Sequence, residues 1–300
     1  MKPLAATCLI DASIYIFQYY FSLPPNWTAR NGYSTEAVYG FATFLLKLKE
    51  QYDPKRLGLC FDESLGQGFR EELYPDYKSS RALPDEALAY QLETCREVAE
   101  LMGIPCFGST RYEADDLIGS LSRIARRSSQ PIAILSRDKD LGQLIRRKQD
   151  YLWDFAKDIA HYDSDIEEKW GVPPEAMADY LALVGDSIDD IPGVPGIGAK
   201  TAAALLQTHG SVKGVYAKLD ELQHMKIRGA KGLADKLEEH LEQVAMAKTL
   251  ATIVCDIPLV DSLQELQWRS ADVDALEQFC ADQGFARLAS RVRKVFGDDA

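Results

Sequence analysis

In this 300-residue sequence, acidic residues follow the short apolar runs, either at once or within a few residues. Carboxylate oxygens are the ligands that Mg²⁺ prefers in proteins. Acids that lie close together repel one another and raise one another's pKa, so a close group makes physical sense mainly when a divalent cation holds it. The residues in such positions are Asp11, Asp62, Glu113, Asp115, Asp116, Asp138 and Asp140. Their placement points to metal-assisted chemistry, although an acidic first turn is also common in ordinary helices.

The apolar runs alternate with helical patterns over roughly the first 170 residues. Strands are predicted at 4–10, 56–61, 104–107, 131–135 and near 151–153, with helices between them, including LGQLIRR after Asp140. This alternation is typical of an α/β fold with a mostly parallel sheet flanked by helices, whose sites lie beyond the carboxyl ends of the strands. The acids then share one edge of the sheet. After about residue 170 the pattern predicts helices only.

The stretch from Gly185 to Leu206 combines two features. It carries Asp186 and Asp189, three residues apart, which one helical turn would place on the same face. A glycine turn follows and opens another helix, where backbone N–H groups and the helix dipole favour a phosphate. The residues in position to contact that phosphate are Gly196, Gly198, Lys200 and Thr201. The turn taken alone is more typical of a plain helix boundary, and the helical pattern before it excludes a nucleotide-binding P-loop.

Residues 63–83 are polar and only weakly periodic, which predicts a long loop. A loop of this length inside a compact domain is usually functional or disordered. Arg70, Lys78 and Arg81 lie among aromatic residues that include Tyr77. Cations interleaved with rings fit a single nucleic-acid strand and its bases. A solvated surface loop explains the same composition equally well.

The overall composition limits the function classes. The net charge of −12 argues against a nucleic-acid partner, although basic residues cluster locally at 123–127 and 146–148. No apolar run reaches the roughly 18 residues of a membrane span, and the N-terminal run breaks at Asp11 before a secretory signal is complete, so we expect a cytoplasmic protein without membrane contact. Six scattered cysteines without a C-x-x-C pair predict free thiols and no zinc site.

These motifs together resemble the bacterial and phage 5′-3′ exonuclease family, which is related to the flap endonucleases and to the N-terminal domain of bacterial DNA polymerase I. The matching segments are LIDAS, FDESLGQGFREELYPDYKSSR, YEADDLIG, SRDKDLGQLI and LVGDSIDDIPGVPGIGAKTAAALL. The resemblance implies a PIN-like nuclease domain at 1–169, with an arch at about 63–90. It also implies an all-helical region at 170–300, whose helix-three-turn-helix module at about 180–250 grips duplex DNA. No polymerase segment follows, so we expect an independent, monomeric protein.

The resemblance also implies roles for single residues. Two Mg²⁺ ions, replaceable by Mn²⁺, would bind at two positions, the first served by Asp11, Asp62, Glu113, Asp115 and Asp116, and the second by Asp138, Asp140, Asp186 and Asp189. The catalytic residues would be Lys78, which matches the arch lysine facing the scissile phosphate, and Arg81, Asp62, Asp115 and Asp138. The DNA contacts would be Arg70, Tyr77, Lys78, Arg81, Gly196, Gly198, Lys200 and Thr201. A potassium ion held by backbone carbonyls would correspond to about Val194 to Ile197.

Two positions depart from the family pattern. Ala12 follows Asp11 where the family commonly has glycine, and Asp190 stands where asparagine is usual. Neither change removes a carboxylate, so the resemblance implies an active, structure-selective 5′-3′ exonuclease or flap endonuclease that acts on DNA with 5′ ends, flaps or nicks. Two alternatives stay open. A PIN-like ribonuclease uses similar carboxylates, and a non-catalytic branched-DNA-binding protein keeps the helical module.

Overall fold

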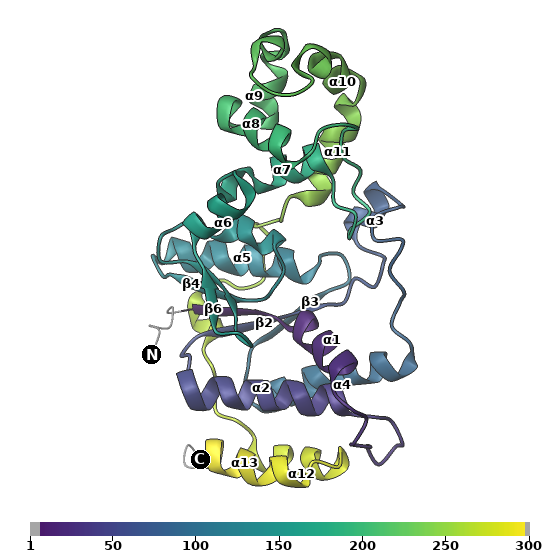
Figure 1. Cartoon of the computed structure of the whole chain (residues 1–300). Coiled ribbons are helices and arrows are strands. Elements are labelled where there is room, and N and C mark those ends of the chain that lie inside the picture. Colours follow the sequence, from purple (N-terminus) through teal and green to yellow (C-terminus); the bar gives the residue numbers. More distant parts are fainter. Residues whose placement is uncertain (1–6, 298–300) are drawn as a thin grey trace.

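A six-stranded sheet forms the centre of the molecule (Figure 1). The structure is a computed structural model that describes residues 7–297, so residues 4–6 of the first predicted strand lie outside the described part. The strand order is β3-β2-β1-β4-β5-β6, and only β6 runs antiparallel to its neighbour. The strands are β1 (Thr7–Asp11), β2 (Leu57–Asp62), β3 (Cys106–Ser109), β4 (Ile132–Leu135), β5 (Tyr151–Asp154) and β6 (Ile159–His161). The predicted mostly parallel sheet is confirmed.

Helices cover both faces of this sheet. One face carries α5 (Ala114–Arg127), and the other carries α1 (Ala12–Ser22), α2 (Glu36–Tyr52) and α4 (Glu86–Leu101). The side chains of β1 alternate between the two faces of the sheet, because successive residues of a strand point to opposite faces. Leu9 packs into the core with α5, whereas Cys8 and Ile10 pack into the core with α2. Since all three are fully buried, a one-residue shift of β1 would disrupt both cores.

A helical lobe stands on the α5 side of the sheet (Figure 1). It consists of α6 (Asp163–Trp170), α7 (Met177–Val184), α8 (Ala199–His209), α9 (Val212–Tyr216), α10 (Leu233–Glu239) and α11 (Leu241–Ala251), joined by the 3₁₀ helices η2 (Pro174–Ala176), η3 (Leu219–His224) and η4 (Ala230–Gly232). After η5 (Leu263–Leu266), α12 (Val273–Asp282) packs on α4 and α13 (Ala286–Phe296) packs on α2, at the opposite side. The region predicted at 170–300 is therefore split: its helices up to α11 form the lobe, and α12 and α13 lie on the opposite side of the sheet. None of the helices in residues 7–297 is long and apolar enough to span a membrane.

Two predicted helical turns are wrong. After Asp140 the chain forms only the 3₁₀ helix η1 (Asp140–Leu144). The side chains of Arg126 and Arg146 bond the carbonyls of Leu144 and Gln143, which a longer helix would use for its own N–H groups. Asp186 and Asp189 also lie outside any helix, because α7 ends at Gly185 with a positive φ of 82°.

Residues 185–193 form a closed loop between α7 and the glycine turn. Asp186 and Ile191 exchange two backbone hydrogen bonds of 2.9 and 2.8 Å. The two ends of the loop touch, since a Cβ on Gly185 would lie 2.5 Å from the Gly193 nitrogen and one on Gly193 only 2.1 Å from the Val184 oxygen. Only glycine fits such a close backbone approach. The tip of this closed loop carries Asp189 and Asp190.

Candidate active site

One cavity of ≈ 250 Å³ collects most of the predicted ligands. The carboxyl ends of β1 and β2 supply Asp11 and Asp62, and the residues around the start of α5 add two more acids. The described acids that line the cavity are Asp11, Asp62, Glu113, Asp115, Asp138 and Asp189, and the cations are Lys78 and Arg81. The strand order therefore brings together side chains that lie far apart in the sequence.

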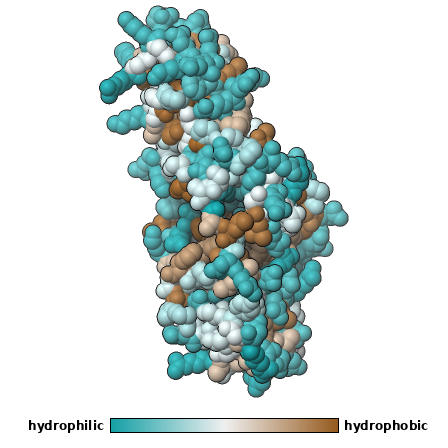
Figure 2. All heavy atoms as spheres, turned by 90° about the vertical axis from the view of Figure 1, so that its right-hand side faces the viewer, coloured by the Kyte–Doolittle hydropathy of each residue, from teal (hydrophilic) through white to brown (hydrophobic). Residues whose placement is uncertain are grey.

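A wider hollow opens beside this cavity, on the face that carries α3 (Phe69–Leu73) (Figure 2). It measures ≈ 470 Å³ and is bordered by residues 64–84. Lys78 and Glu113 line its polar side, while Leu65 and Leu83, 52% and 69% exposed, line its apolar side. A cation next to apolar surface suits a single nucleic-acid strand, which presents phosphates and base faces together.

Burial and mutual repulsion raise the pKa values of several of these acids. Burial, followed by the charge of Asp138, raises the pKa of Asp11 to about 7 and that of Asp140 to about 7. The same two causes raise the pKa of Asp115 well above its usual range. The carboxylates in this group carry more negative charge than the nearby cations offset, and a bound divalent cation would relieve that repulsion.

Glu113 is the exception, because two cations face it. Burial alone would raise its pKa, but Lys78 and Arg70 hold it below the usual range. The Lys78 ammonium lies 2.6 Å from Glu113 Oε1, and the Tyr77 hydroxyl donates to Oε2 at 3.0 Å. Glu113 therefore stays ionised and anchors the arch residues at the edge of the cavity.

Three predicted site residues are almost fully buried. Arg70 is 3% and Asp116 0% exposed, and they form a two-pronged ion pair at 2.6 and 2.8 Å. Their remaining groups are also used, since Arg70 Nε donates to the Leu250 carbonyl and Asp116 accepts from the Val254 N–H, both at 2.8 Å. Tyr77 is 3% exposed. Arg70 and Asp116 therefore already satisfy each other, whereas Tyr77 still lines the wider hollow; the expected DNA contacts of Arg70 and Tyr77 and the expected metal contact of Asp116 stay predictions.

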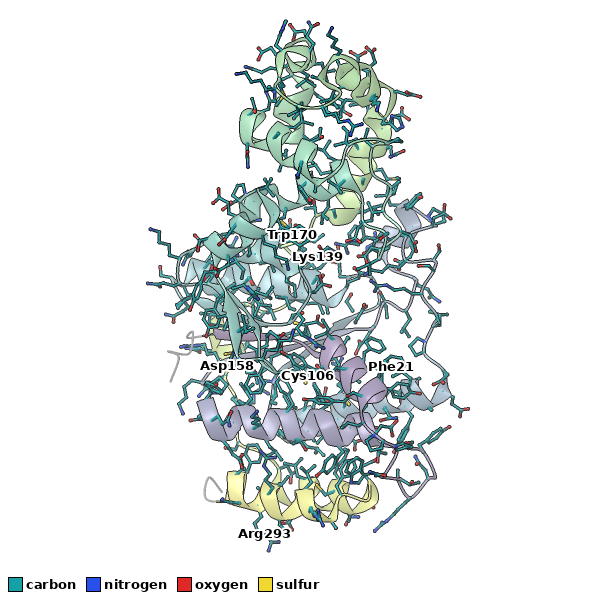
Figure 3. All side chains as sticks on the ribbon, viewed as in Figure 1. Phe21, Cys106, Lys139, Asp158, Trp170 and Arg293 are labelled. Atoms are coloured by element: carbon teal, nitrogen blue, oxygen red, sulfur yellow. The ribbon has the colours of Figure 1, made fainter. Side chains whose placement is uncertain are left out.

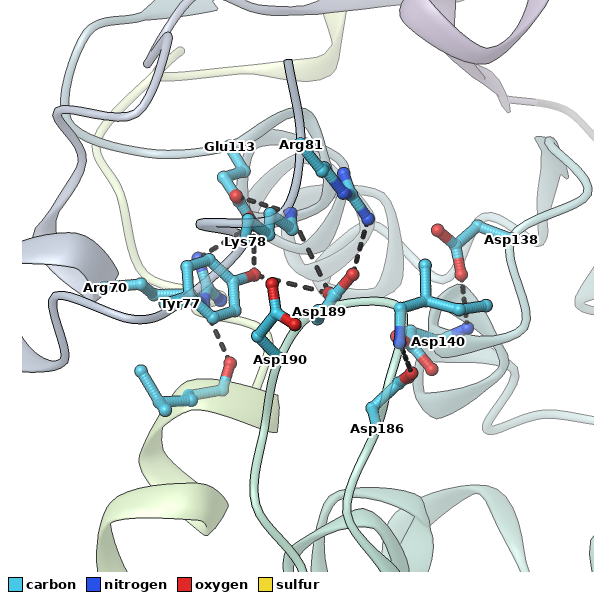
Figure 4. A network of polar contacts seen from close by, with 12 residues as sticks. Arg70, Tyr77, Lys78, Arg81, Glu113, Asp138, Asp140, Asp186, Asp189 and Asp190 are labelled. Atoms are coloured by element: carbon cyan, nitrogen blue, oxygen red, sulfur yellow. Dashed lines mark hydrogen bonds and ion pairs between the residues drawn. The ribbon is translucent and has the colours of Figure 1, made fainter. Parts of the chain in front are cut away.

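The arch is attached to the tip of the closed loop. Arg81 forms an ion pair with Asp189, and Lys78 Nζ lies 3.8 Å from the same carboxylate, as Figure 4 shows. Ser80 donates to Asp190 through its backbone N–H at 3.0 Å and its hydroxyl at 2.7 Å. Asp190 adopts a left-handed φ of 54°, a conformation in which asparagine and aspartate are enriched.

The glycine turn leads into α8 as predicted, with Gly198 at its N-cap and Gly196 in a left-handed conformation of φ 83°. Lys200 is exposed and Thr201 half-buried, while the side chains of Val194 and Ile197 are buried. A distant lysine also reaches the turn: a Cβ on Gly196 would lie 2.7 Å from Lys236 Nζ. The turn therefore carries two cations, Lys200 and Lys236, on its exposed side.

Sequence reasoning missed several residues that hold the site in place. Ser136 donates to Asp11 Oδ2 at 3.0 Å, and Ser13 accepts from the Asp62 N–H at 3.0 Å. Gln243, on α11, donates to the Gly193 carbonyl at 2.9 Å. Ser13 and Ser136 lie next to strand ends, which was a usable signal. Gln243 and Lys236 have no local signal, because only the packing of α10 and α11 brings them to the turn.

The donor set fits a hard cation, although its side chains are not gathered into a cage. In residues 7–297, no three acidic, histidine or cysteine side chains stand close enough together to hold an ion as placed. The chemistry nevertheless suits Mg²⁺, because the cavity presents carboxylate oxygens and no thiolate. Asp140 Oδ1 is buried and accepts no hydrogen bond from the described residues. The Lys139 ammonium lies 3.4 Å from this oxygen without donating a hydrogen bond to it, so the oxygen can still bind a metal ion.

The raised pKa values predict how stability depends on pH. Asp11 and Asp140 bind protons more tightly in the folded protein, with pKa values of about 7 against 3.8. Their favourable contribution is complete below the unfolded value and is lost as the pH rises through about 7. We therefore expect the Tm of the protein in EDTA to fall between about pH 4 and pH 7. Calorimetry should show a flatter profile for Asp11→Asn, and a wild-type Tm that rises across this window would contradict the prediction.

Comparison with known proteins places these features in one family. Residues 6–171 match the family model described as 5′-3′ exonuclease, N-terminal resolvase-like domain, and residues 172–274 match 5′-3′ exonuclease, C-terminal SAM fold. DNA polymerase I of Pseudomonas aeruginosa is 39% identical over 264 residues, covering 87% of this chain and 28% of that protein. DNA polymerase I of Rhizobium leguminosarum is 33% identical over 299 residues, covering 97% and 29%. The chain thus spans less than a third of these relatives.

Solved structures share the fold at low sequence identity. The T5 5′-exonuclease with bound divalent metal ions (zinc) aligns with a TM-score of 0.66 and 21% identity, over 92% of this chain and 97% of that one. The catalytic core of Rad2 in complex with DNA substrate aligns with a TM-score of 0.62 and 19% identity, over 99% and 94%. Both alignments cover more than nine tenths of this chain.

Proposed function

The chain belongs to the 5′-3′ exonuclease family, and from this premise we propose that it hydrolyses DNA phosphodiester bonds near 5′ ends, flaps or nicks with the help of divalent metal ions. The observation that carries the proposal is the cavity in which strand-end carboxylates meet the arch cations Lys78 and Arg81. A carboxylate cluster supports metal binding, and adjacent cations support binding of a phosphate.

The ligands divide into two sets in this proposal. One ion would be bound by Asp11, Asp62, Glu113 and Asp115, and the other by Asp138, Asp140, Asp186 and Asp189. Asp116 belongs to neither set, because Arg70 donates hydrogen bonds to both of its carboxylate oxygens. The ions, Mg²⁺ or Mn²⁺, would supply Lewis acidity, which activates water and offsets charge on the phosphate.

The chain's own cations would position the substrate. Lys78 and Arg81 now face Glu113 and Asp189, and an incoming phosphate offers them an alternative anionic partner at the same cavity. Away from the cavity, Gly196, Gly198, Lys200 and Thr201 would hold the duplex backbone without reading bases. The carbonyls of Val194 to Ile197 would hold a potassium ion there. Such a division gives preference for DNA structure rather than for sequence.

Cleavage of a labelled 5′-flap duplex and a matched single strand, each in Mg²⁺ and in EDTA, tests the proposed function. We expect metal-dependent cutting near the flap junction and much weaker cutting of the single strand. Efficient cutting of RNA regardless of duplex structure would favour the ribonuclease. Tight duplex binding without cutting in Mg²⁺ or Mn²⁺ would favour the binding protein.

Removal of the arch lysine tests the role of the cations. We expect Lys78→Met to slow cleavage about 100-fold, because it removes a charge aimed at the phosphate. The variant also leaves Glu113 without its closest cation, so its Tm must be recorded beside the rate. Lys148→Met, an exposed site outside the cavity, is the control and should cleave normally. Single-turnover cleavage rates at saturating enzyme measure the effect. An unchanged rate for Lys78→Met would exclude a role of Lys78 in binding the phosphate.

A further inference from the structure

A lysine lies among the carboxylates of the second ligand set. Lys139 precedes η1, and Figure 3 labels it where the helical lobe meets the sheet. Its ammonium forms an ion pair with Asp186 Oδ2 and lies 3.4 Å from Asp140 Oδ1. The Lys139 side chain is 26% exposed and that of Asp186 only 5%, so solvent screens this contact weakly.

The position of this ammonium matters because its two partners come from different elements. Asp140 begins η1, whereas Asp186 belongs to the closed loop 185–193. The charges of Asp138, Asp186 and Asp189 all act on Asp140. Such neighbours repel one another strongly where water is largely absent. Lys139 offsets that repulsion in the metal-free protein and joins the two elements.

We infer that Lys139 is a built-in counterion, which a divalent cation must displace from Asp140 and Asp186 before it binds them. The inference rests on the proposed function, since it assumes that these acids bind metal. An ammonium group and a metal ion compete for the same oxygens, because each carries positive charge to the same carboxylates. The flexible four-carbon stem of lysine allows the ammonium to leave without movement of η1 or the closed loop. Lys139 therefore weakens metal binding and keeps the empty site in shape.

Titration of the full chain with MnCl₂, followed by electron paramagnetic resonance without DNA, tests this inference. We expect Lys139→Met to bind Mn²⁺ about tenfold more tightly than the wild type, a change of the size that residues around metal ligands produce. The same variant should have a lower Tm in EDTA and regain it when Mn²⁺ is added. Lys139→Arg keeps the charge and should retain weaker Mn²⁺ binding. Lys157→Met removes an equal charge from a 67% exposed lysine paired with Asp154 and should change neither property.

The outcomes separate this inference from the proposed function. If the wild type binds Mn²⁺ and Lys139→Met binds it equally or more weakly, the counterion role is wrong and the metal-dependent nuclease still stands. If the wild type neither binds Mn²⁺ nor cleaves the 5′-flap duplex, both the counterion role and the proposed nuclease function are wrong. Tighter binding by Lys139→Met but not by Lys139→Arg or Lys157→Met supports the inference, whatever the cleavage rate of the variant.

Discussion

Asp138→Asn is expected to slow phosphodiester cleavage by about 1,000-fold, because a bound metal ion supplies several kcal/mol of charge stabilisation and each 1.36 kcal/mol is tenfold in rate. The change is nearly isosteric. Asp138 Oδ1 accepts the Asp140 N–H at 2.9 Å, and the asparagine oxygen can accept the same bond. Only the charge that faces the cavity is lost, so we expect duplex DNA to bind with unchanged affinity.

Single-turnover cleavage of a labelled 5′-flap duplex in Mg²⁺ measures this effect, and fluorescence anisotropy in EDTA measures binding. Asp256→Asn makes the same chemical change at an exposed position outside the cavity and should leave both quantities unchanged. Full cleavage activity in Asp138→Asn would remove Asp138 from the metal assignment. Loss of binding together with cleavage would mean that the substitution disturbs more than the metal.

The second large effect concerns stability. Arg70→Met is expected to lower the free energy of unfolding by about 3–5 kcal/mol, because it leaves the Asp116 carboxylate buried without its cation. The pair joins α3 to α5, and Arg70 also donates to the carbonyls of Leu250, in the last turn of α11, and Thr252, at its C-cap. Urea unfolding in EDTA measures the change. The double variant Arg70→Met/Asp116→Leu should recover much of the loss, since it removes both charges.

An exposed pair in the same part of the chain provides the control. Arg111 lies 3.2 Å from Glu72, and both side chains are more than half exposed. Arg111→Met should cost at most about 1 kcal/mol, as solvent screens such pairs. Equal losses for Arg70→Met and Arg111→Met would show that the buried pair contributes no more than a surface contact.

The sheet and its acidic edge were predictable because both follow from local patterns. Apolar runs of strand length ending in acids identify β1, β2 and β4, and parallel order brings Asp11, Asp62 and Asp138 to one edge. Topology alone suffices for this step. It requires no knowledge of which side chains touch.

The features that the sequence did not predict depend on contacts between segments that are distant in the chain. An acidic first turn looks the same whether it binds metal or a buried arginine, and Arg70 lies 46 residues from Asp116. The spacing of Asp186 and Asp189 suits a helix, but the backbone contact between Gly185 and Gly193 forces a closed loop instead. The return of α12 to α4 and of α13 to α2 likewise depends on tertiary packing, which the helical periodicity of these segments does not specify.

The closed loop 185–193 has a consequence for which mutations this chain can tolerate. Gly185 and Gly193 line neither the cavity nor the hollow beside it, yet a single methyl group on either would collide with backbone across the neck of the loop. Opening the neck would move Asp186, Asp189 and the arch contacts of Asp190 together. We therefore expect substitution of either glycine to disturb the site as much as the loss of a carboxylate, although neither glycine lines the cavity.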